Sequence, residues 1–226
     1  MIFELGKENI FPPVSLADES GIIAIGGDLS YPRLIEAYRS GIFPWYSENE
    51  PIIWWTPESR FVLFPDEIIV SRSMRKILNR EIFKFTYDQC FKEVIELCSS
   101  VERKQEGTWI TNDMIDAYNN LHEQGMAHSI EAWNNGELVG GLYGVSMGRC
   151  FFGESMFTKV SNASKAAFIT LIRKLKDLDF FLIDCQVYTE HLQSLGARMI
   201  PRKEFISILN RALKFDTVVG NWGNIL

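Results

Sequence analysis

Three polar residues stand where apolar strands are expected, and their types suit proton transfer and amine binding. Glu154 lies inside the run Cys-Phe-Phe-Gly-Glu-Ser-Met-Phe (150–157), and Asp184 and Gln186 lie in Phe-Phe-Leu-Ile-Asp-Cys-Gln-Val (180–187). A charged group in an apolar strand must find a partner or face a cleft. The strand period of two puts Asp184 and Gln186 on one face. We therefore expect two carboxylates and an amide to converge on one cleft.

This set of groups suits the transfer of an acyl group from an ester to an amine. A protein α-amino group has an ordinary pKa of about 7.7–8.0, so part of it is neutral near pH 7.5 without a strong base. Gln186 cannot act as a base, because an amide only donates and accepts hydrogen bonds; we expect it to orient the amine or to donate to the tetrahedral oxygen. Asp184 or Glu154 would attract the ammonium and help remove its proton.

Each carboxylate also has a structural interpretation. Glu154 could form a buried ion pair, and Asp184 could cap the end of its strand onto the next loop. Cys185 points to the other strand face and lacks an adjacent histidine, so thiol catalysis is disfavoured. The chain has four cysteines, none in a C-x-x-C pair, and three histidines. We expect reduced thiols, no zinc site and no cofactor.

The bulk composition is that of a water-soluble globular protein. The chain has 226 residues, 46% hydrophobic and 23% charged, with a net charge of −6. Its apolar runs are too short to span a membrane, and residues 1–8 lack the pattern of a signal peptide. We expect a cytoplasmic monomer of one or two domains with no membrane partner. The negative charge argues against indiscriminate coating of nucleic acid but leaves room for a local basic patch.

Such a patch is predicted within residues 71–84. This stretch holds five basic residues and one acid. Residues 72, 75/76 and 80 fall on one helix side, opposite Met74, Ile77 and Leu78. The basic residues expected to contact a phosphate backbone are Arg72, Arg75, Lys76 and Arg80. The alternative is a solvated helix face.

Tryptophans next to prolines and turns form a second feature of the first half. Trp45, Trp54 and Trp55 fall within eleven residues, and Trp109 follows a charged loop at 102–107. Aromatic side chains on rigid loops fill a core or provide stacking platforms for bases.

The order of elements predicts an α+β fold. Residues 128–157 read as three antiparallel strands with an Asn-Gly turn at 135–136. A helix to about Asp177, a central strand at 180–187 and a last helix at 203–214 follow. This order of meander, helix, strand and helix resembles the GNAT-type acyltransferase fold. We expect a small N-terminal domain at 1–60 and a GNAT-like catalytic domain at 61–226.

Ten motifs, in order along nearly the whole chain, resemble those of the bacterial leucyl/phenylalanyl-tRNA–protein transferases. The first five are GGDLS (26–30), GIFPWY (41–46), WWTP (54–57), SRSMR (71–75) and GTWIT (107–111). The others are HSIE (128–131), GESMF (153–157), NASK (162–165), LIDCQ (182–186) and SLGA (194–197). Residues 1–20 and about 212–226 match no motif.

The resemblance implies an aminoacyltransferase that uses no metal. It would move Leu or Phe, and less readily Met, from aminoacyl-tRNA to proteins with an N-terminal Arg or Lys, which creates an N-end-rule degradation signal. By motif, Glu154, Asp184 and Gln186 would form the polar site. Trp45 and Trp109 would hold the terminal adenosine of the tRNA, and the basic cluster would meet the acceptor stem.

The resemblance also implies a pocket for the transferred side chain, lined by Leu142, Phe151, Met156 and Leu171. Leu142 and Leu171 stand where the family can have Met and Phe, and Thr189 stands where Asn is expected. These departures leave the preference between Leu and Phe open, because apolar fit separates similar side chains by only about 1–3 kcal/mol.

Two other functions fit parts of the sequence. An acyl-CoA-dependent N-acyltransferase would share the fold, but the loop before its helix usually supplies glycines for pyrophosphate, and residues 161–165 have none. A non-catalytic RNA-binding module would use the tryptophans and the basic stretch but give no role to Glu154, Asp184 or Gln186.

Overall fold

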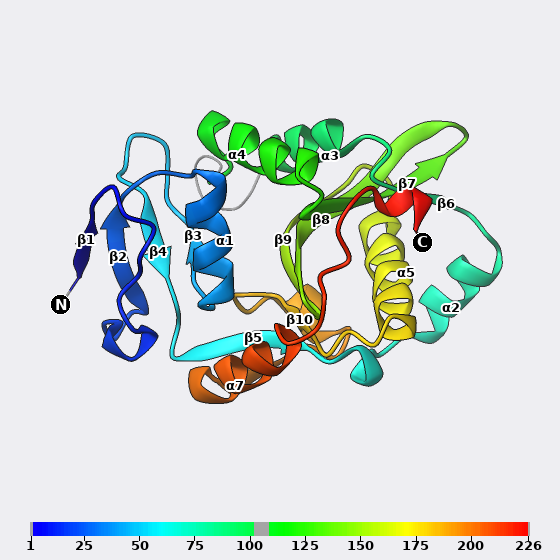
Figure 1. Ribbon diagram of the computed structural model, residues 1–226. Coiled ribbons are helices and arrows are strands. Elements are labelled where there is room, and N and C mark those ends of the chain that lie inside the picture. The colour runs from blue at the N-terminus through cyan, green and yellow to red at the C-terminus, as the bar shows by residue number, and fades with distance from the viewer. Residues whose placement is uncertain (1, 102–108, 226) are drawn as a thin grey trace.

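Two β-sheets organise the chain, a small one at the N-terminal end and a large one beyond it (Figure 1). The computed structural model describes residues 2–101 and 109–225, so the predicted charged loop at 102–107 and the start of the GTWIT motif lie outside it. The small sheet has the order β1-β2-β4-β3 and the large one the order β11-β5-β10-β9-β8-β7-β6. The predicted α+β class is confirmed. β5 opens the large sheet at Ser59, and the boundary at residue 60 stays a prediction.

The small sheet contains β1 (Phe3–Leu5), β2 (Ile22–Gly26), β3 (Phe43–Pro44) and β4 (Ile53–Trp55), with a short 3-10 helix η1 (Val14–Leu16). Helix α1 (Tyr31–Arg39) packs beside it, with Pro32 in its first turn, where proline costs nothing. The helix stops before Gly41. Gly41 has φ +74°, and a Cβ there would lie 2.5 Å from Ile206 of α7, so only glycine fits.

The large sheet is built on the predicted meander of β7 (Ala127–Asn134), β8 (Glu137–Met147) and β9 (Cys150–Thr158). Asn135 and Gly136 both have positive φ, which matches the twist of a two-residue hairpin turn. After the meander come α5 (Ala163–Asp177), β10 (Leu182–Asp184), α6 (Glu190–Gln193), β11 (Arg198–Pro201) and α7 (Arg202–Ala212). The element order predicted for a GNAT-like domain is therefore confirmed, with β10 parallel to β9.

Two predicted elements are shorter than expected. The central strand ends at Asp184 rather than Val187, because the chain turns out of the sheet at 185–187. The basic helix ends at Asn79 as α2 (Arg72–Asn79), and Glu81 takes a positive φ. Aromatic and β-branched residues then form an edge strand, β6 (Lys84–Tyr87), which pairs with β7 and was missed from the sequence.

The remaining elements are one strand of the large sheet and the other helices. They are β5 (Ser59–Leu63), α3 (Phe91–Ser99), α4 (Asn112–Glu123) and the 3-10 helices η2 (Pro65–Glu67) and η3 (Trp222–Asn224). Helices α1, α3 and α4 lie on one side of the sheet and α5 on the other (Figure 1). Each side has its own apolar core, one containing Tyr38, Tyr118 and Phe152, the other Leu142, Phe151 and Trp222. In the described part of the chain no helix is long and apolar enough to cross a membrane.

Candidate functional site

The large sheet opens between β9 and β10. The two strands pair in parallel from Leu182↔Cys150 to Asp184↔Phe152, and there the pairing ends, although β9 continues to Thr158. Within residues 2–101 and 109–225, no strand pairs with this side of β9 beyond Phe152. The pairing of β8 with β9 shifts here as well and leaves Glu154 as an extra residue between Gly153 and Ser155. A bulge of this kind re-aims a side chain next to an opening in a sheet.

Glu154 accepts three side-chain hydrogen bonds at this opening. Tyr38 Oη of α1 lies 2.7 Å and Tyr118 Oη of α4 3.1 Å from the carboxylate, and Gln186 Nε2 donates at 2.9 Å. The two tyrosine hydroxyls are also within hydrogen-bonding contact of each other. Because each carries one hydrogen, the three O–H···O contacts among Tyr38, Tyr118 and Glu154 share two hydroxyl hydrogens while Glu154 is ionised. The partners are neutral, so the buried ion pair considered from the sequence does not form.

The environment of Glu154 raises its pKa to about 7. Burial is the main cause, and the nearby charge of Asp184 acts in the same direction; the hydrogen bonds from Tyr38, Tyr118 and Gln186 oppose it. A carboxyl group with a pKa near neutrality can both accept and return a proton at physiological pH. Glu154 is therefore the residue of this cluster that is suited to proton transfer.

Asp184 is occupied by another partner. Arg60 of β5 donates from Nε to Oδ1 at 2.8 Å and from Nη2 to Oδ2 at 2.7 Å, and both side chains are buried. Oδ1 also accepts the backbone N–H of Gln186 at 2.9 Å, which is the strand-end cap considered from the sequence. A fully buried carboxylate needs such a cation. Asp184 is thus bonded to Arg60 and to the backbone of Gln186, and the attraction of an ammonium by Asp184 or Glu154 stays a prediction.

Gln186 reaches the site through a tight turn. Its φ is +62°, and Val187 N donates to Cys185 O at 2.7 Å around it. A γ-turn of this hand is rare and strained, and such strain persists only where the surroundings enforce it. The expected convergence of Gln186 with Glu154 is found, but the turn produces it rather than strand alternation.

Three residues of the cluster were missed from the sequence: Tyr38, Tyr118 and Arg60. Signals for them existed. Both tyrosines stand on the apolar faces of their helices, where a buried hydroxyl needs a partner. Arg60 is the second residue of the strand at 59–63 and precedes an apolar run, and a guanidinium buried there needs a carboxylate.

The segments carrying Trp45 and Trp109 lie together. Tyr46 Oη and Thr111 Oγ1 approach to 3.4 Å, and each of these residues is within two positions of one tryptophan. Trp45 is half-buried, and its ring lies 5.9 Å from that of Trp55. The same segments continue from α1 and into α4, which supply the tyrosines on Glu154. The predicted tryptophan pair therefore belongs to the elements that surround the cluster, and its contact with adenosine stays a prediction.

The residues predicted to line a side-chain pocket lie on the other face of the sheet. Leu142, Phe151 and Leu171 are at most 2% exposed and pack into the core under α5. Met156 is half-buried on β9 beyond the point where β10 ends, so it is the member nearest the opening. The assignment of these four residues to a pocket stays a prediction.

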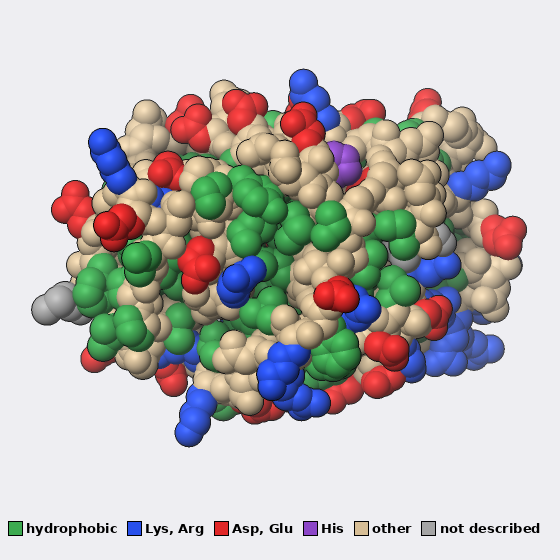
Figure 2. Space-filling model, in the orientation of Figure 1, with side chains coloured by type: hydrophobic (Ala, Val, Ile, Leu, Met, Phe, Trp, Pro, Cys, Tyr) green, Lys and Arg blue, Asp and Glu red, His purple; other side chains and the backbone are tan. Residues whose placement is uncertain are grey.

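The predicted basic stretch is a surface feature. Arg72, Arg75 and Lys76 on α2 and Arg80 at its end are exposed, while Met74 is buried beneath them. Figure 2 shows Lys and Arg side chains gathered where Figure 1 draws α2.

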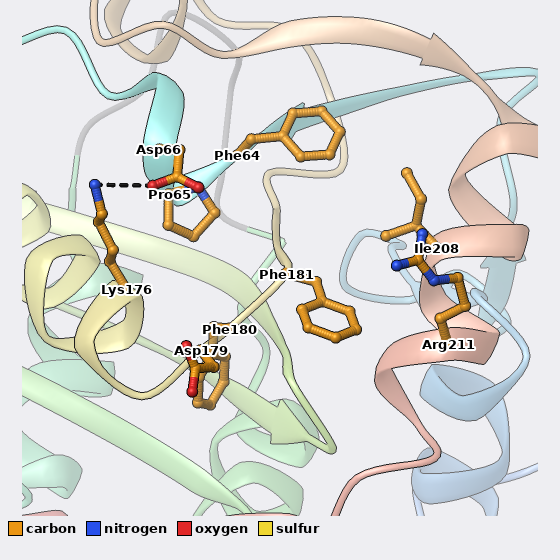
Figure 3. A pocket seen from close by; sticks show the side chains of 9 residues that line it. All are labelled: Phe64, Pro65, Asp66, Lys176, Asp179, Phe180, Phe181, Ile208 and Arg211. Atoms are coloured by element: carbon orange, nitrogen blue, oxygen red, sulfur yellow. Dashed lines mark ion pairs between the residues drawn. The ribbon is translucent and has the colours of Figure 1, made fainter.

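A cavity of about 500 Å³ lies elsewhere, at the opposite end of β10. Phe64, Phe181 and Ile208 form its apolar walls, and the Lys176–Asp66 ion pair and Arg211 border it (Figure 3). None of the predicted site residues lines it.

Comparison with known proteins identifies the family. The family model described as leucyl/phenylalanyl-tRNA protein transferase matches residues 62–210, and the model of that transferase's N-terminal domain matches residues 27–58. The chain belongs to the leucyl/phenylalanyl-tRNA protein transferase family. It is an aminoacyltransferase, and the predicted resemblance is confirmed.

Relatives of this family cover almost the whole chain. The chain is 60% identical to the leucyl/phenylalanyl-tRNA–protein transferase of Syntrophus aciditrophicus, covering 98% of this chain and 93% of that protein. It is 59% identical to the enzyme of the same name from Flavobacterium johnsoniae, covering 92% and 99%, and 55% identical to that of Myxococcus xanthus, covering 98% and 96%.

Solved structures show a fainter likeness. A GCN5-related N-acetyltransferase from Anabaena variabilis is 12% identical with a TM-score of 0.42, over 79% of this chain and 43% of that one. L-PGS from Bacillus licheniformis is 15% identical with a TM-score of 0.40, over 76% and 57%.

Proposed function

We propose that the protein transfers Leu or Phe, and less readily Met, from aminoacyl-tRNA to the α-amino group of proteins that begin with Arg or Lys. The relatives named above are leucyl/phenylalanyl-tRNA–protein transferases, and they support the donor and the reaction. The product would carry an N-end-rule degradation signal in the cytoplasm. The observation that carries the reaction is a near-neutral carboxyl, Glu154, held beside an amide at an opening in the sheet.

The chemistry follows from the Glu154 cluster. The carboxylate attracts the α-ammonium of the acceptor and takes its proton, since the two pKa values, about 7 and about 7.7–8.0, are close. The neutral nitrogen attacks the ester carbonyl and forms the C–N bond. Gln186 donates through Nε2 to the developing oxyanion once the substrates displace its bond to Glu154. The C–O bond to the ribose breaks, and Glu154 gives its proton to that oxygen. The nitrogen, positively charged since the attack, then loses its extra proton to the vacated carboxylate, and the peptide bond is neutral; Glu154 releases this last proton to solvent.

Holding the two substrates together supplies most of the acceleration, up to roughly 7–11 kcal/mol. We assign Trp45 and Trp109 to the terminal adenosine, because their segments surround the cluster and aromatic rings stack on any base. The pocket of Leu142, Phe151, Met156 and Leu171 would receive the transferred side chain by widening at the end of β10. The basic residues of α2 would contact tRNA phosphates.

The transfer itself is tested with radiolabelled Leu-tRNA or Phe-tRNA and an acceptor protein that begins with Lys or Arg. We expect label on this acceptor and none on the same protein beginning with Ala. Absence of label from both acceptors would overturn the proposed reaction, and labelling from an acyl-CoA instead would favour the alternative enzyme class.

The tRNA surface is tested by the double variant Arg75→Ala with Arg80→Ala. It should weaken tRNA binding and reduce the slope of log K against log salt by about one to two phosphate contacts. The matched control, Lys203→Ala with Lys214→Ala, removes two exposed cations from the region of α7 and should leave the slope unchanged. Equal salt slopes in the two variants would mean that the basic residues of α2 form a solvated surface and do not contact tRNA.

A further inference from the structure

Arg60 and Asp184 form a buried ion pair directly behind the candidate site. Arg60 is 1% and Asp184 0% exposed, and the guanidinium grips the carboxylate with two parallel bonds of 2.8 and 2.7 Å. Two such bonds fix the orientation of the carboxylate as well as its position. A lysine in place of Arg60 could supply the charge but not this orientation.

Two aromatic rings hold the guanidinium in turn. Its Cζ lies 4.5 Å from the centroid of Phe43, on β3 of the small sheet, and 4.7 Å from that of Phe205, on α7. A desolvated cation over aromatic faces is held by the ring quadrupoles. The ion pair thus links β5 and β10 to β3 and α7, and the side chain of Arg60 has little conformational freedom.

Stability alone does not explain a pair like this one. Replacing a buried ion pair by well-packed apolar residues is often neutral or stabilising, because desolvation offsets the attraction between the charges. The pair does have a second consequence here. Asp184 Oδ1, fixed by Arg60, accepts the N–H of Gln186, the residue with φ +62°.

The residue after Arg60 holds the same turn from the other side. Phe61 O accepts from Cys185 N at 2.9 Å, and Phe61 N donates to Gln186 O at 3.4 Å. The strained turn is thereby fastened on both sides to consecutive residues of β5. The side chain that leaves this turn donates to Glu154.

We propose that Arg60 is a positioning residue for the transfer reaction, acting through Asp184 to hold Gln186 in the turn that aims its amide at Glu154 and the reacting ester. The inference rests on the proposed function for the identity of the reaction. The geometry is independent of the proposed function. Hydrogen bonds link Arg60 to Asp184, Asp184 to Gln186, and Gln186 to Glu154.

The experiment compares two substitutions of Arg60 with one at a matched site. Arg60→Met removes the cation, and Arg60→Lys keeps the charge but loses the two-pronged grip. The control is Arg33→Met, because Arg33 is also fully buried and bonded to Asp28, Gly6 and Glu8, but in the N-terminal region. Three quantities are measured in each folded protein: the single-turnover transfer rate at saturating aminoacyl-tRNA, the Kd for that tRNA, and the hydrogen-exchange rate of the Gln186 N–H.

We expect Arg60→Lys to slow transfer about 100-fold, as a small displacement of a reacting group does, with the Kd for tRNA unchanged within about threefold. Exchange at Gln186 N–H should rise by at least tenfold, roughly, as Asp184 loses its fixed orientation. Arg60→Met should show a larger loss of rate, or fail to fold because Asp184 is left unpaired. Arg33→Met should lower stability and leave the rate of the folded protein unchanged.

Two results would overturn the proposal: a wild-type transfer rate with wild-type exchange at Gln186 in Arg60→Lys, or an equal loss of rate in Arg33→Met. If the wild-type protein transfers nothing, the proposed function fails instead. The exchange measurement at Gln186 then still decides whether Arg60 positions this residue.

Discussion

Two buried polar clusters lie on the large sheet, and they differ in what their carboxylates hold. The Glu154 cluster contains Glu154, Gln186, Asp184, Arg60, Tyr38 and Tyr118; the Asp88 cluster contains Asp88, His128, Ser129 and Trp222. Each includes a non-glycine residue with positive φ, +62° at Gln186 and +52° at Asp88. Burial and an unusual backbone angle therefore do not by themselves mark a site.

The Asp88 cluster has a structural role: it joins the C-terminal segment to β7. Asp88 accepts from the backbone N–H groups of Ser129 at 2.8 Å and Trp222 at 2.7 Å, and from His128 Nδ1 at 2.9 Å. The His128 ring stacks on Trp222 at 3.8 Å, so the cluster fastens the C-terminal segment to β7. The Glu154 cluster instead consists of side chains that meet where strand pairing stops. On this contrast rests our proposal that the chemistry belongs to the cluster at the interrupted sheet.

The largest expected effect that tests this contrast is in Glu154→Gln. The variant keeps the shape of the side chain and loses the proton acceptor, so transfer should fall about 10²–10⁴-fold, the usual contribution of a general base. The Kd for tRNA should change little. Rates come from single-turnover assays on labelled Leu-tRNA. A variant that transfers within threefold of wild type, roughly, would remove Glu154 from the chemistry.

Asp88→Ala should give the reverse pattern. Two backbone N–H groups and a buried imidazole lose their partner, so unfolding free energy should drop by about 3 kcal/mol while the folded fraction keeps its transfer rate. Urea titration measures the first quantity, and assays well below the midpoint measure the second. Asp88→Asn, which retains one acceptor, should lose less. A stable but inactive Asp88→Ala variant would break the comparison.

The two clusters should also respond to pH with opposite signs. The pKa of Glu154 is about 7 in the folded protein and 4.5 for an ordinary glutamate, so between these pH values the folded state binds a proton that the unfolded state has lost. Protonation of Glu154 therefore adds to the free energy of unfolding, by at most about 3 kcal/mol. This stabilisation is fully present below pH 4.5 and is lost as the pH rises through 7. Burial lowers the pKa of His128 below its ordinary 6.5, so the neutral imidazole is favoured in the folded state. The stability that this gives is fully present above pH 6.5 and is lost as the pH falls through the lowered pKa. Unfolding free energies are measured from pH 4.5 to 7.5 for wild type, Glu154→Gln and His128→Gln. As the pH rises, the difference between wild type and variant should shift in one direction for Glu154→Gln and in the other for His128→Gln. Shifts in the same direction would contradict both assignments.

The smallest expected effect is in Tyr38→Phe. The Tyr38 hydroxyl lowers the pKa of Glu154, so its loss should raise that pKa and move the inflection of the transfer rate to higher pH. The rate at pH 7 should change by only about three- to tenfold, the value of one hydrogen bond. A pH–rate profile measures the shift. Movement of the inflection to lower pH would contradict the donor role of the hydroxyl.

Much of this arrangement could be predicted from the sequence, because local patterns carried it. Asn135–Gly136 predicted the hairpin, and isolated acids in apolar strands predicted the residues at the opening. The small sheet and β6 were missed, since their strands are short and alternate weakly. The relation of Asp184 to Arg60 joins residues 124 positions apart, and no local pattern reports such a contact.

The place of Gln186 shows a second limit. Strand periodicity correctly predicted that Gln186 lies near Glu154, but the reason was wrong. β10 ends at Asp184, two residues before Gln186, and a γ-turn places the amide beside Glu154. Likewise, periodicity alone did not show that the predicted side-chain pocket and Glu154 lie on opposite faces, which meet only where β9 and β10 part.

Gln186→Gly tests the central claim most directly. Glycine accepts positive φ and keeps the N–H bonded to Asp184 while it removes the side chain that carries the amide. The control Asp179→Gly also replaces a residue of positive φ, +58°, with glycine, but at an exposed position. Both variants should be at least as stable as wild type. Single-turnover transfer from bound Phe-tRNA should fall about 100-fold in Gln186→Gly alone. An unchanged rate in Gln186→Gly would contradict the assignment of aminoacyl transfer to the Glu154 cluster.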